Sequence, residues 1–283
     1  VPEYLRRLKA APSVLLGLCD NAFTPEAFFA LERKRVFVSS LRENHHYKAI
    51  IDYLGRTRYA TRNRIRKAVG IGSGGSLTAL LADLESCGFV EKYTPLYLGP
   101  DSLAVRYCIS DEYLQFHQRF IHPVSERIQR GEFIDDPTRA LNMGSFRQVL
   151  GLSFERWCRK NSHIFARMLG FDRIEYQCGA FFNRKTAELD EGFQIDLAYI
   201  RRDAKVLICE IKYTDAPIGG EVMEDVIRKE KLFRQAYPKC RNYTYETALI
   251  ATEGSRQTTP QREFFDHVIT FDDIFDSRHW CMR

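Results

Sequence analysis

Apolar side chains recur every three to four positions along three stretches of the first half of the chain, at 47–54, 61–69 and 76–84. This is the spacing of amphipathic helices. Two short runs rich in β-forming residues follow at 89–93 and 105–109, separated by a loop that contains proline and glycine. The pattern therefore predicts three helices followed by a β-hairpin, which is the arrangement of a winged helix-turn-helix.

The second half of the chain alternates strand-like and helix-like segments. Helical spacing runs through 145–169 and returns in the charged segment 222–237. Strand patterns at 193–200 and 206–213 flank a short turn, and a further apolar strand is expected at 247–251. Strands with helices on both sides predict an α/β domain.

The remaining segments give the predicted domain limits. Residues 1–43 have the pattern of short helices and are too few for a core of their own, so they are expected to pack against a neighbour. Residues 44–122 hold the predicted winged helix and a trailing aromatic helix. The polar stretch 123–143 is expected to be a linker, and 144–283 the α/β domain.

The composition is that of an ordinary globular protein. Of the 283 residues, 45% are hydrophobic and 28% are charged, which excludes a mainly disordered or fibrous chain. No apolar run approaches the roughly 18–20 residues of a membrane-spanning helix, and no secretory signal is evident. The eight cysteines include no CxxC pair, which favours a reduced, cytoplasmic protein over a disulfide framework.

The net charge of +5 is small, but basic residues gather ahead of and within the second predicted helix. Six of them, with no acidic residue between, are Arg56, Arg58, Arg62, Arg64, Arg66 and Lys67. They are suited to contact nucleic-acid phosphates, and a solvated helix face explains them equally well. The third helix exposes no Arg, Lys, Asn or Gln to read base edges, so the module could instead dock another protein.

The strand pair of the second half is predicted to place two carboxylates opposite each other. With a three-residue turn at 202–204, Ile200 pairs with Val206, and counting outward sets Asp196 across from Glu210. Their Cβ atoms would then be about 4.5–5.5 Å apart, and like charges at that separation destabilise a sheet. A divalent cation would neutralise them, and Mg²⁺ prefers such oxygen ligands.

Lys212 adds a positive group to this pair. It lies two residues beyond Glu210 and therefore on the same face of the strand. Two carboxylates and an ammonium on one face suit metal-assisted hydrolysis of a phosphodiester. The same letters arise by chance in charged hairpins, but here the neighbouring residues are apolar and indicate buried central strands, where charges are costly.

These residues carry a resemblance to a known family. The sequences QIDL at 194–197 and ICEIKY at 208–213 resemble the PD-(D/E)xK nuclease superfamily, with Asp196, Glu210 and Lys212 at its motif positions. The resemblance implies that the second domain has the α/β fold of restriction endonucleases. It also implies that the protein is a metal-dependent DNA endonuclease.

The resemblance also implies a set of roles. Asp196 and Glu210 would hold Mg²⁺ or Mn²⁺, and the carbonyl of Ile211 would complete the coordination. Glu155, on the preceding helix, matches the position where many members place an additional metal-binding glutamate. Lys212 would position water and stabilise charge. An open cleft around these groups would favour catalysis, whereas a buried Glu210–Lys212 ion pair without room for water would oppose it.

More specifically, nearly the whole chain resembles the C-terminal part of prokaryotic AAA-type predicted ATPases that end in such a domain. PEYL at 2–5 resembles the start of their lid region and TRNRI at 61–65 their winged helix. KEKLF at 229–233 and FDDIF at 271–275 resemble their closing segments. The chain lacks GxxxxGK[ST], so no ATP site is expected in it. An ATPase core is expected upstream or in trans, with Val1 at the edge of a larger protein.

Two other features have ordinary explanations. GIGSGG at 70–75 fits the letters of a dinucleotide site but follows a helix, so a flexible turn is favoured. Lys229 matches a recurring lysine of the family and could face the site, although a helix-surface lysine is the more frequent explanation. We therefore expect a metal-dependent DNA nuclease or, alternatively, a non-catalytic DNA-binding or partner-docking module of an ATPase.

Overall fold

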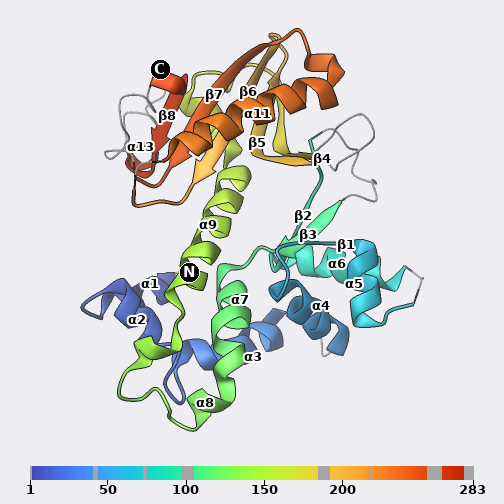
Figure 1. The fold of residues 1–283 in the computed structure, drawn as a ribbon. Helices are drawn as coiled ribbons and strands as arrows, with labels where there is room; N and C mark the ends of the chain where they lie inside the picture. Colours follow the sequence, from blue (N-terminus) through green and yellow to red (C-terminus); the bar gives the residue numbers. More distant parts are fainter. Residues whose placement is uncertain are drawn as a thin grey trace. The chain divides into compact units, whose positions relative to one another are not determined.

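The chain forms two compact units (Figure 1). The first draws on Val1–Tyr93 and Asp101–Phe146, and the second on Thr94–Pro100 and Arg147–Arg283. The computed structural model describes residues 2–40, 44–72, 75–96, 105–183, 192–216, 218–253 and 263–276. No helix in these ranges is long and apolar enough to cross a membrane.

The first unit begins with three helices that pack against a later one. Their bounds are Pro2–Lys9 for α1, Val14–Asp20 for α2 and Phe28–Ser40 for α3, and α7 spans Glu112–Phe116. The rings of Tyr4 and Phe29 lie 5.3 Å apart, and those of Tyr4 and Tyr113 lie 5.8 Å apart. The Tyr113 hydroxyl donates a hydrogen bond to the carbonyl of Phe29. α1 and α3 therefore share a core with α7.

The predicted three helices and hairpin are present in the first unit. Their bounds are His45–Gly55 for α4, Arg62–Val69 for α5, Ser76–Ser86 for α6, Val90–Tyr93 for β2 and Arg106–Ile109 for β3. The short strand β1 (Ala60–Thr61) joins them in an antiparallel sheet of order β1-β3-β2. Thr61 is the N-cap residue of α5, although its side chain makes no capping hydrogen bond. Residues 73 and 74 of the glycine-rich turn lie outside the described residues.

The segment 123–143, predicted to be a linker, belongs instead to the first unit. It follows the π-helix η1 (His117–Ile121) and contains most of η2 (His122–Val124), together with α8 (Ser125–Gln129) and η3 (Pro137–Ala140). Ile128, Phe133 and Leu141 are all buried. These apolar residues are few and lack a regular period, which gives the segment a polar composition although it is folded.

The second unit contains a mixed five-stranded sheet of order β4-β5-β6-β7-β8. The strands are Tyr176–Asn183, Phe193–Arg201, Lys205–Lys212, Thr244–Ala251 and His267–Thr270. Neighbouring strands are antiparallel from β4 to β6 and parallel from β6 to β8. Its described helices are most of α9 (Met143–Lys160), together with α10 (Ser162–Met168), α11 (Gly220–Ala236), η4 (Pro238–Cys240) and α13 (Phe271–Phe275).

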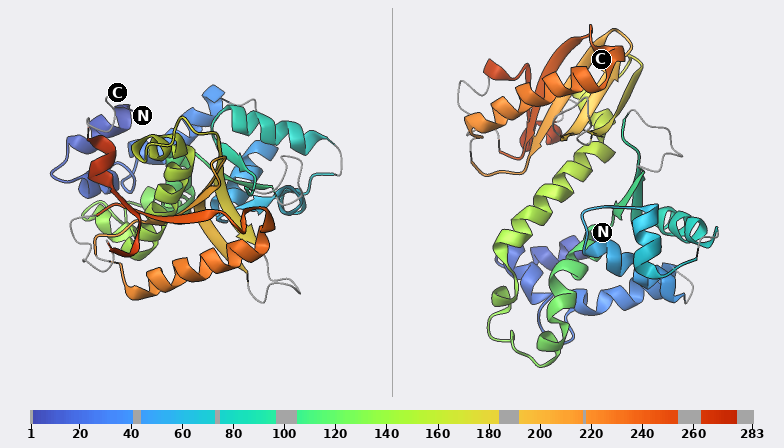
Figure 2. Two further views of the ribbon diagram at one scale, coloured as in Figure 1. Left: turned by 90° about the horizontal axis from the view of Figure 1, so that it is seen from above. Right: turned by 45° about the vertical axis from the view of Figure 1, so that its right-hand side comes forward.

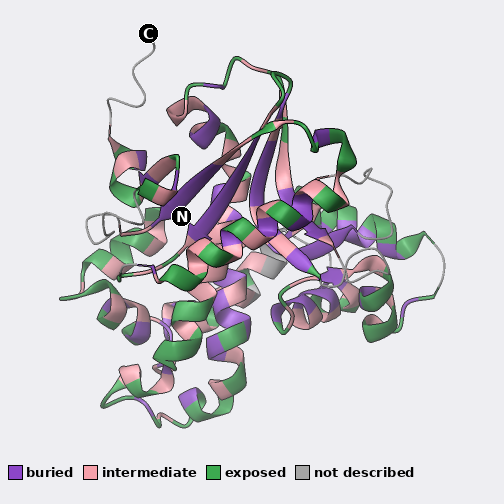
Figure 3. Ribbon diagram, turned by 45° about the horizontal axis from the view of Figure 1, so that its top comes forward, coloured by how far each residue is buried: buried purple, intermediate pink, exposed green. Residues whose placement is uncertain are grey.

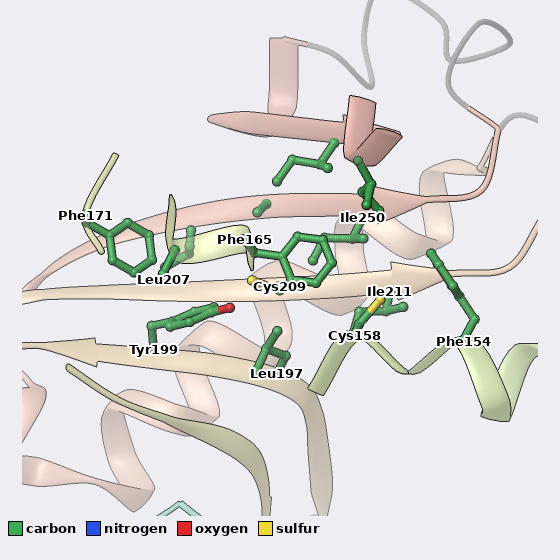
Figure 4. Close-up of a cluster of buried hydrophobic side chains, with 14 residues drawn as sticks. Phe154, Cys158, Phe165, Phe171, Leu197, Tyr199, Leu207, Cys209, Ile211 and Ile250 are labelled. Atoms are coloured by element: carbon green, nitrogen blue, oxygen red, sulfur yellow. The ribbon is translucent and has the colours of Figure 1, made fainter. Parts of the chain in front are cut away.

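Helices cover both faces of this sheet. Figure 4 shows one core, where Leu197, Cys209 and other strand residues meet Phe154 of α9 and Phe165 of α10. On the other face, residues of β4, β5 and β6 pack against Phe233 of α11, which runs along the sheet (Figure 2). The strands are largely buried, while the outer side of α11 is exposed (Figure 3). The result is a three-layer α/β/α arrangement.

Candidate functional site

The register of β5 and β6 agrees with the sequence prediction. Ile200 pairs with Val206, and the pairing continues to Leu197 with Cys209. Glu210 follows directly after this last pair. One further step of the same register sets Asp196 beside it.

On its other edge, β5 contains a β-bulge. Ala198 pairs with Gly179 of β4, but Ile195 pairs with Phe181. Two residues of β5, Asp196 and Leu197, therefore lie opposite one residue of β4, which is the definition of a bulge. The extra residue changes the face to which the strand's side chains point. Ile195 packs in the core beside α11, whereas Leu197 packs in the core beside α9 and α10.

Glu210 is the central group of the site. It lies on β6 between Cys209 and Ile211, which both face the α9 and α10 core, so strand alternation turns Glu210 toward α11. Its side chain is only 2% exposed, and each oxygen has a lysine partner. Lys212 Nζ lies 2.8 Å from Oε1 and Lys229 Nζ lies 2.8 Å from Oε2. Glu210 and Lys212 therefore share a face, as their spacing predicted.

Lys229 reaches this carboxylate from α11. It is buried, and its ammonium also lies 2.8 Å from Asp225 Oδ2, one helical turn earlier. Burial alone would lower the pKa of Lys229, but the carboxylates of Glu210 and Asp225 outweigh it and raise that pKa above its usual value. Asp225 also pairs with Arg228. Lys229 is therefore a charged group held between two carboxylates.

Asp196 is half-buried at the bulge. The side-chain amide of Gln194 donates a hydrogen bond to its Oδ1 at 3.1 Å. Burial raises the pKa of the Asp196 carboxyl, and the negative charge of Glu210 raises it further, while Lys229 opposes the shift. The negative charge of Glu210 therefore acts on Asp196, as expected for two carboxylates predicted to lie together.

Two further residues of the predicted site lie on other parts of the second unit. Glu155 is half-buried on α9, and its Oε2 lies 3.9 Å from a guanidinium nitrogen of Arg159. The side chain of Ile211 is buried in the α9 and α10 core, which leaves only its backbone carbonyl for the predicted role. Within the described ranges, no three His, Cys, Asp or Glu side chains form a group that could hold a metal ion. The predicted convergence of Glu155 with the two strand carboxylates is thus absent from this arrangement.

The predicted basic residues lie along α5 and the turn before it in the first unit. Arg56, Arg58, Arg64 and Lys67 are exposed, and Arg62 and Arg66 are half-buried. Arg62 donates a hydrogen bond from Nε to the Thr78 hydroxyl at 3.1 Å, which links α5 to α6. The exposed members of the set are accessible to a polyanion.

Sequence reasoning underestimated α11 and missed the bulge. The sequence leaves Lys229 open between the site and the helix surface, and the structure places it on Glu210. The sequence gives no role to Asp225 or to the side chain of Gln194. The usable signal was the i,i+4 spacing of Asp225 and Lys229 on a helix whose neighbouring residues Val226 and Phe233 are buried. That spacing predicts an ion pair next to the helix's buried face.

Comparisons with known proteins identify a curated relative and a solved structure that are similar to the chain. No protein-family model matches the chain. Uncharacterized protein MJECL04 of Methanocaldococcus jannaschii is 25% identical over 210 residues, which are 73% of this chain and 45% of that protein. The chain therefore spans less than half the length of this curated relative. The structure of SdaI restriction endonuclease is 13% identical, aligned over 90% of this chain and 93% of that one, with a TM-score of 0.27. A TM-score this low does not establish a shared fold.

Proposed function

We propose that the second unit is a PD-(D/E)xK, restriction-endonuclease-like domain that hydrolyses DNA phosphodiesters with Mg²⁺ or Mn²⁺. One observation carries the proposal: Glu210, 2% exposed on a central strand, lies between two lysines and next to a second carboxylate whose pKa it raises. Buried charge of this kind costs folding free energy and adds little stability. Such clusters of perturbed groups concentrate at functional sites.

The donor groups suit a divalent cation in part. Asp196 and Glu210 supply the hard oxygen ligands that Mg²⁺ prefers, and Mg²⁺ often takes only one or two protein carboxylates. Among the described residues, Gln194 donates to Oδ1 of Asp196, which leaves Oδ2 for another ligand. The repulsion that raises the pKa of Asp196 would be relieved by a cation held between the two carboxylates. We therefore assign Asp196 and Glu210 as the metal ligands.

The roles of the remaining residues follow from their positions. A bound ion would polarise the phosphate and activate water. Lys212, whose side chain is 37% exposed, can leave Glu210 to orient water or to stabilise charge on the phosphate. The carbonyl of Ile211 would complete the coordination, whereas Glu155 pairs with Arg159 and is given no ligand role.

The first unit would hold the DNA. Its three helices and hairpin support the interpretation as a winged helix-turn-helix, and α5 carries most of the basic set 56–67. Contacts from these side chains to phosphates would position the duplex without reading its sequence. α6 exposes Thr78, Asp83 and Glu85 and thus offers few groups for base edges.

A second candidate is a non-catalytic DNA-binding or docking module of an AAA-type ATPase, with the ATPase core upstream or in trans. The observation that favours it is the pairing of both Glu210 oxygens with lysines at a site that is almost closed to solvent. An ion pair satisfied in this way can be purely structural.

Plasmid nicking by the purified chain separates the two candidates. The wild-type chain should convert supercoiled DNA to open circles with Mg²⁺ or Mn²⁺ and should stop when EDTA is added. Asp196→Asn and Lys212→Gln should lose this activity because each removes a charge that the reaction needs, and Asp196→Asn does so without a change of shape. Lys231→Gln, an exposed lysine on α11, is the matched control. Equal cleavage by all four proteins would refute the site, and no cleavage by any would favour the docking module.

A further inference from the structure

Two ammonium groups reach Glu210, and their surroundings differ. Lys212 Nζ is 2.8 Å from Oε1, and its side chain is 37% exposed, so it can turn into solvent. Lys229 Nζ is 2.8 Å from Oε2, and its side chain is only 10% exposed. Lys229 therefore stays beside the carboxylate, whereas Lys212 can leave it.

Asp225 fixes Lys229 in this place. Its Oδ2 lies 2.8 Å from the same ammonium, one turn earlier on α11. A lysine with a second counter-ion on its own helix loses little freedom when it also pairs with Glu210. If Glu210 takes another cation, Asp225 still neutralises the lysine.

We propose that Lys229 is the resident cation of the site, and that it competes with the divalent ion for Glu210. This inference rests on the proposed function, because the ion concerned is the one that Asp196 and Glu210 would bind. In the metal-free protein, Lys229 neutralises a carboxylate that is almost fully buried. An incoming ion must share that carboxylate with a positive charge that cannot move into water, and this repulsion weakens metal binding.

The test is the affinity of the full chain for Mn²⁺ and Mg²⁺, measured by titration calorimetry. Lys229→Gln keeps a hydrogen-bond donor to Glu210 but removes the charge. This variant should bind Mn²⁺ at least about tenfold more tightly than the wild type, because a repulsive charge next to the ligand is gone. Its metal-free midpoint of thermal unfolding should fall, and its gain in midpoint on adding Mn²⁺ should exceed that of the wild type.

Two other variants control the interpretation. Lys231→Gln removes the same charge from an exposed position on the same helix and should change the affinity by less than about twofold. Asp225→Asn removes the second counter-ion, leaves Lys229 to Glu210 alone, and should weaken Mn²⁺ binding. Asp225 is partly exposed, so this variant should fold and keeps the test available if Lys229→Gln does not fold.

The outcomes separate this inference from the nuclease proposal. Tighter Mn²⁺ binding by Lys229→Gln supports the resident cation even when no protein cleaves DNA. Wild-type cleavage combined with unchanged or weaker Mn²⁺ binding by Lys229→Gln overturns the inference alone. An equal gain by Lys231→Gln, or tighter binding by Asp225→Asn, also overturns it. If neither the wild type nor Lys229→Gln takes up Mn²⁺, both proposals fail.

Discussion

Replacing Lys229 by methionine should strongly destabilise the metal-free second unit. Methionine fills a similar volume but leaves the buried Glu210 carboxylate with Lys212 alone. Two unit charges 2.8 Å apart interact by about 6 kcal/mol at an effective dielectric constant of about 20. Part of this is offset because the lysine no longer has to be desolvated, which costs several kcal/mol. Removing one partner of a buried pair typically costs about 3–5 kcal/mol. We expect a loss of about 3 kcal/mol, because Lys212 still neutralises part of the Glu210 charge.

Urea unfolding in EDTA, followed by tryptophan fluorescence, measures this loss, because both tryptophans belong to the sequence range of the second unit. The double variant Glu210→Met with Lys229→Met removes both charges and should be at least about 1 kcal/mol more stable than the sum of the single losses implies. Lys231→Met should change the free energy of unfolding by less than about 0.5 kcal/mol. A loss below about 1 kcal/mol for Lys229→Met, or strictly additive single losses, would refute the buried pair.

Four further predictions follow from other groups. Asp196→Asn should raise the free energy of unfolding at pH 7. Folding raises the pKa of Asp196, so the protonated carboxyl stabilises the folded state. This stability is fully present below the unfolded pKa and is lost as pH rises through the folded pKa, whereas asparagine stays neutral throughout. The gain in urea midpoint should therefore vanish below about pH 4, and a gain that persists there would contradict this cause. Burial lowers the pKa of His117 to about 4, so stability present above pH 6.5 should fall by about 3 kcal/mol as pH drops through 4. Circular dichroism melts should show a smaller acid loss for His117→Gln, and an unchanged loss would exclude this histidine. Gly70→Ala should cost about 1 kcal/mol in chemical unfolding, because φ at Gly70 is +71°, a left-handed conformation that is unfavourable for an L side chain. Among the described residues, no atom within 4 Å would clash with the added Cβ, so the conformation alone sets this cost; a neutral result would contradict the left-handed cap. Arg64→Ala should weaken duplex binding in fluorescence anisotropy and reduce the slope of log K against log salt by about 1. An unchanged slope would remove this part of α5 from the interface.

The elements with one dominant period were predictable from the sequence. α4, α5 and α6 begin and end within a few residues of the predicted limits, and their stripes of apolar residues are buried. The register of β5 and β6 followed from a short turn that allowed a single pairing. In these places the local pattern and the tertiary packing favour the same structure.

The bulge and the role of Lys229 were not predictable in the same way. Phe193, Ile195, Leu197 and Tyr199 alternate without interruption, which predicts a single face, yet the structure divides them between two cores. Because Ala198 and Ile200 are also apolar, either face of this part of the strand can be buried. The alternation therefore cannot show which face packs against which core. Lys229 has its partner Glu210 19 residues earlier, on a strand. The period of a helix predicts contacts within that helix only, so it cannot predict this one.

The bulge of β5 lies where the pairing of this strand with β6 ends. β5 pairs with β4 on both sides of the bulge, whereas its register with β6 ends at Leu197 and Cys209. The two carboxylates thus lie just beyond the last pair of these two strands, and Asp196 belongs to the bulge itself. Deleting one residue at the bulge would restore regular pairing with β4. It would also reverse the face of every side chain on one side of the deletion. The one extra residue in β5 therefore sets the face on which Asp196 lies relative to Glu210.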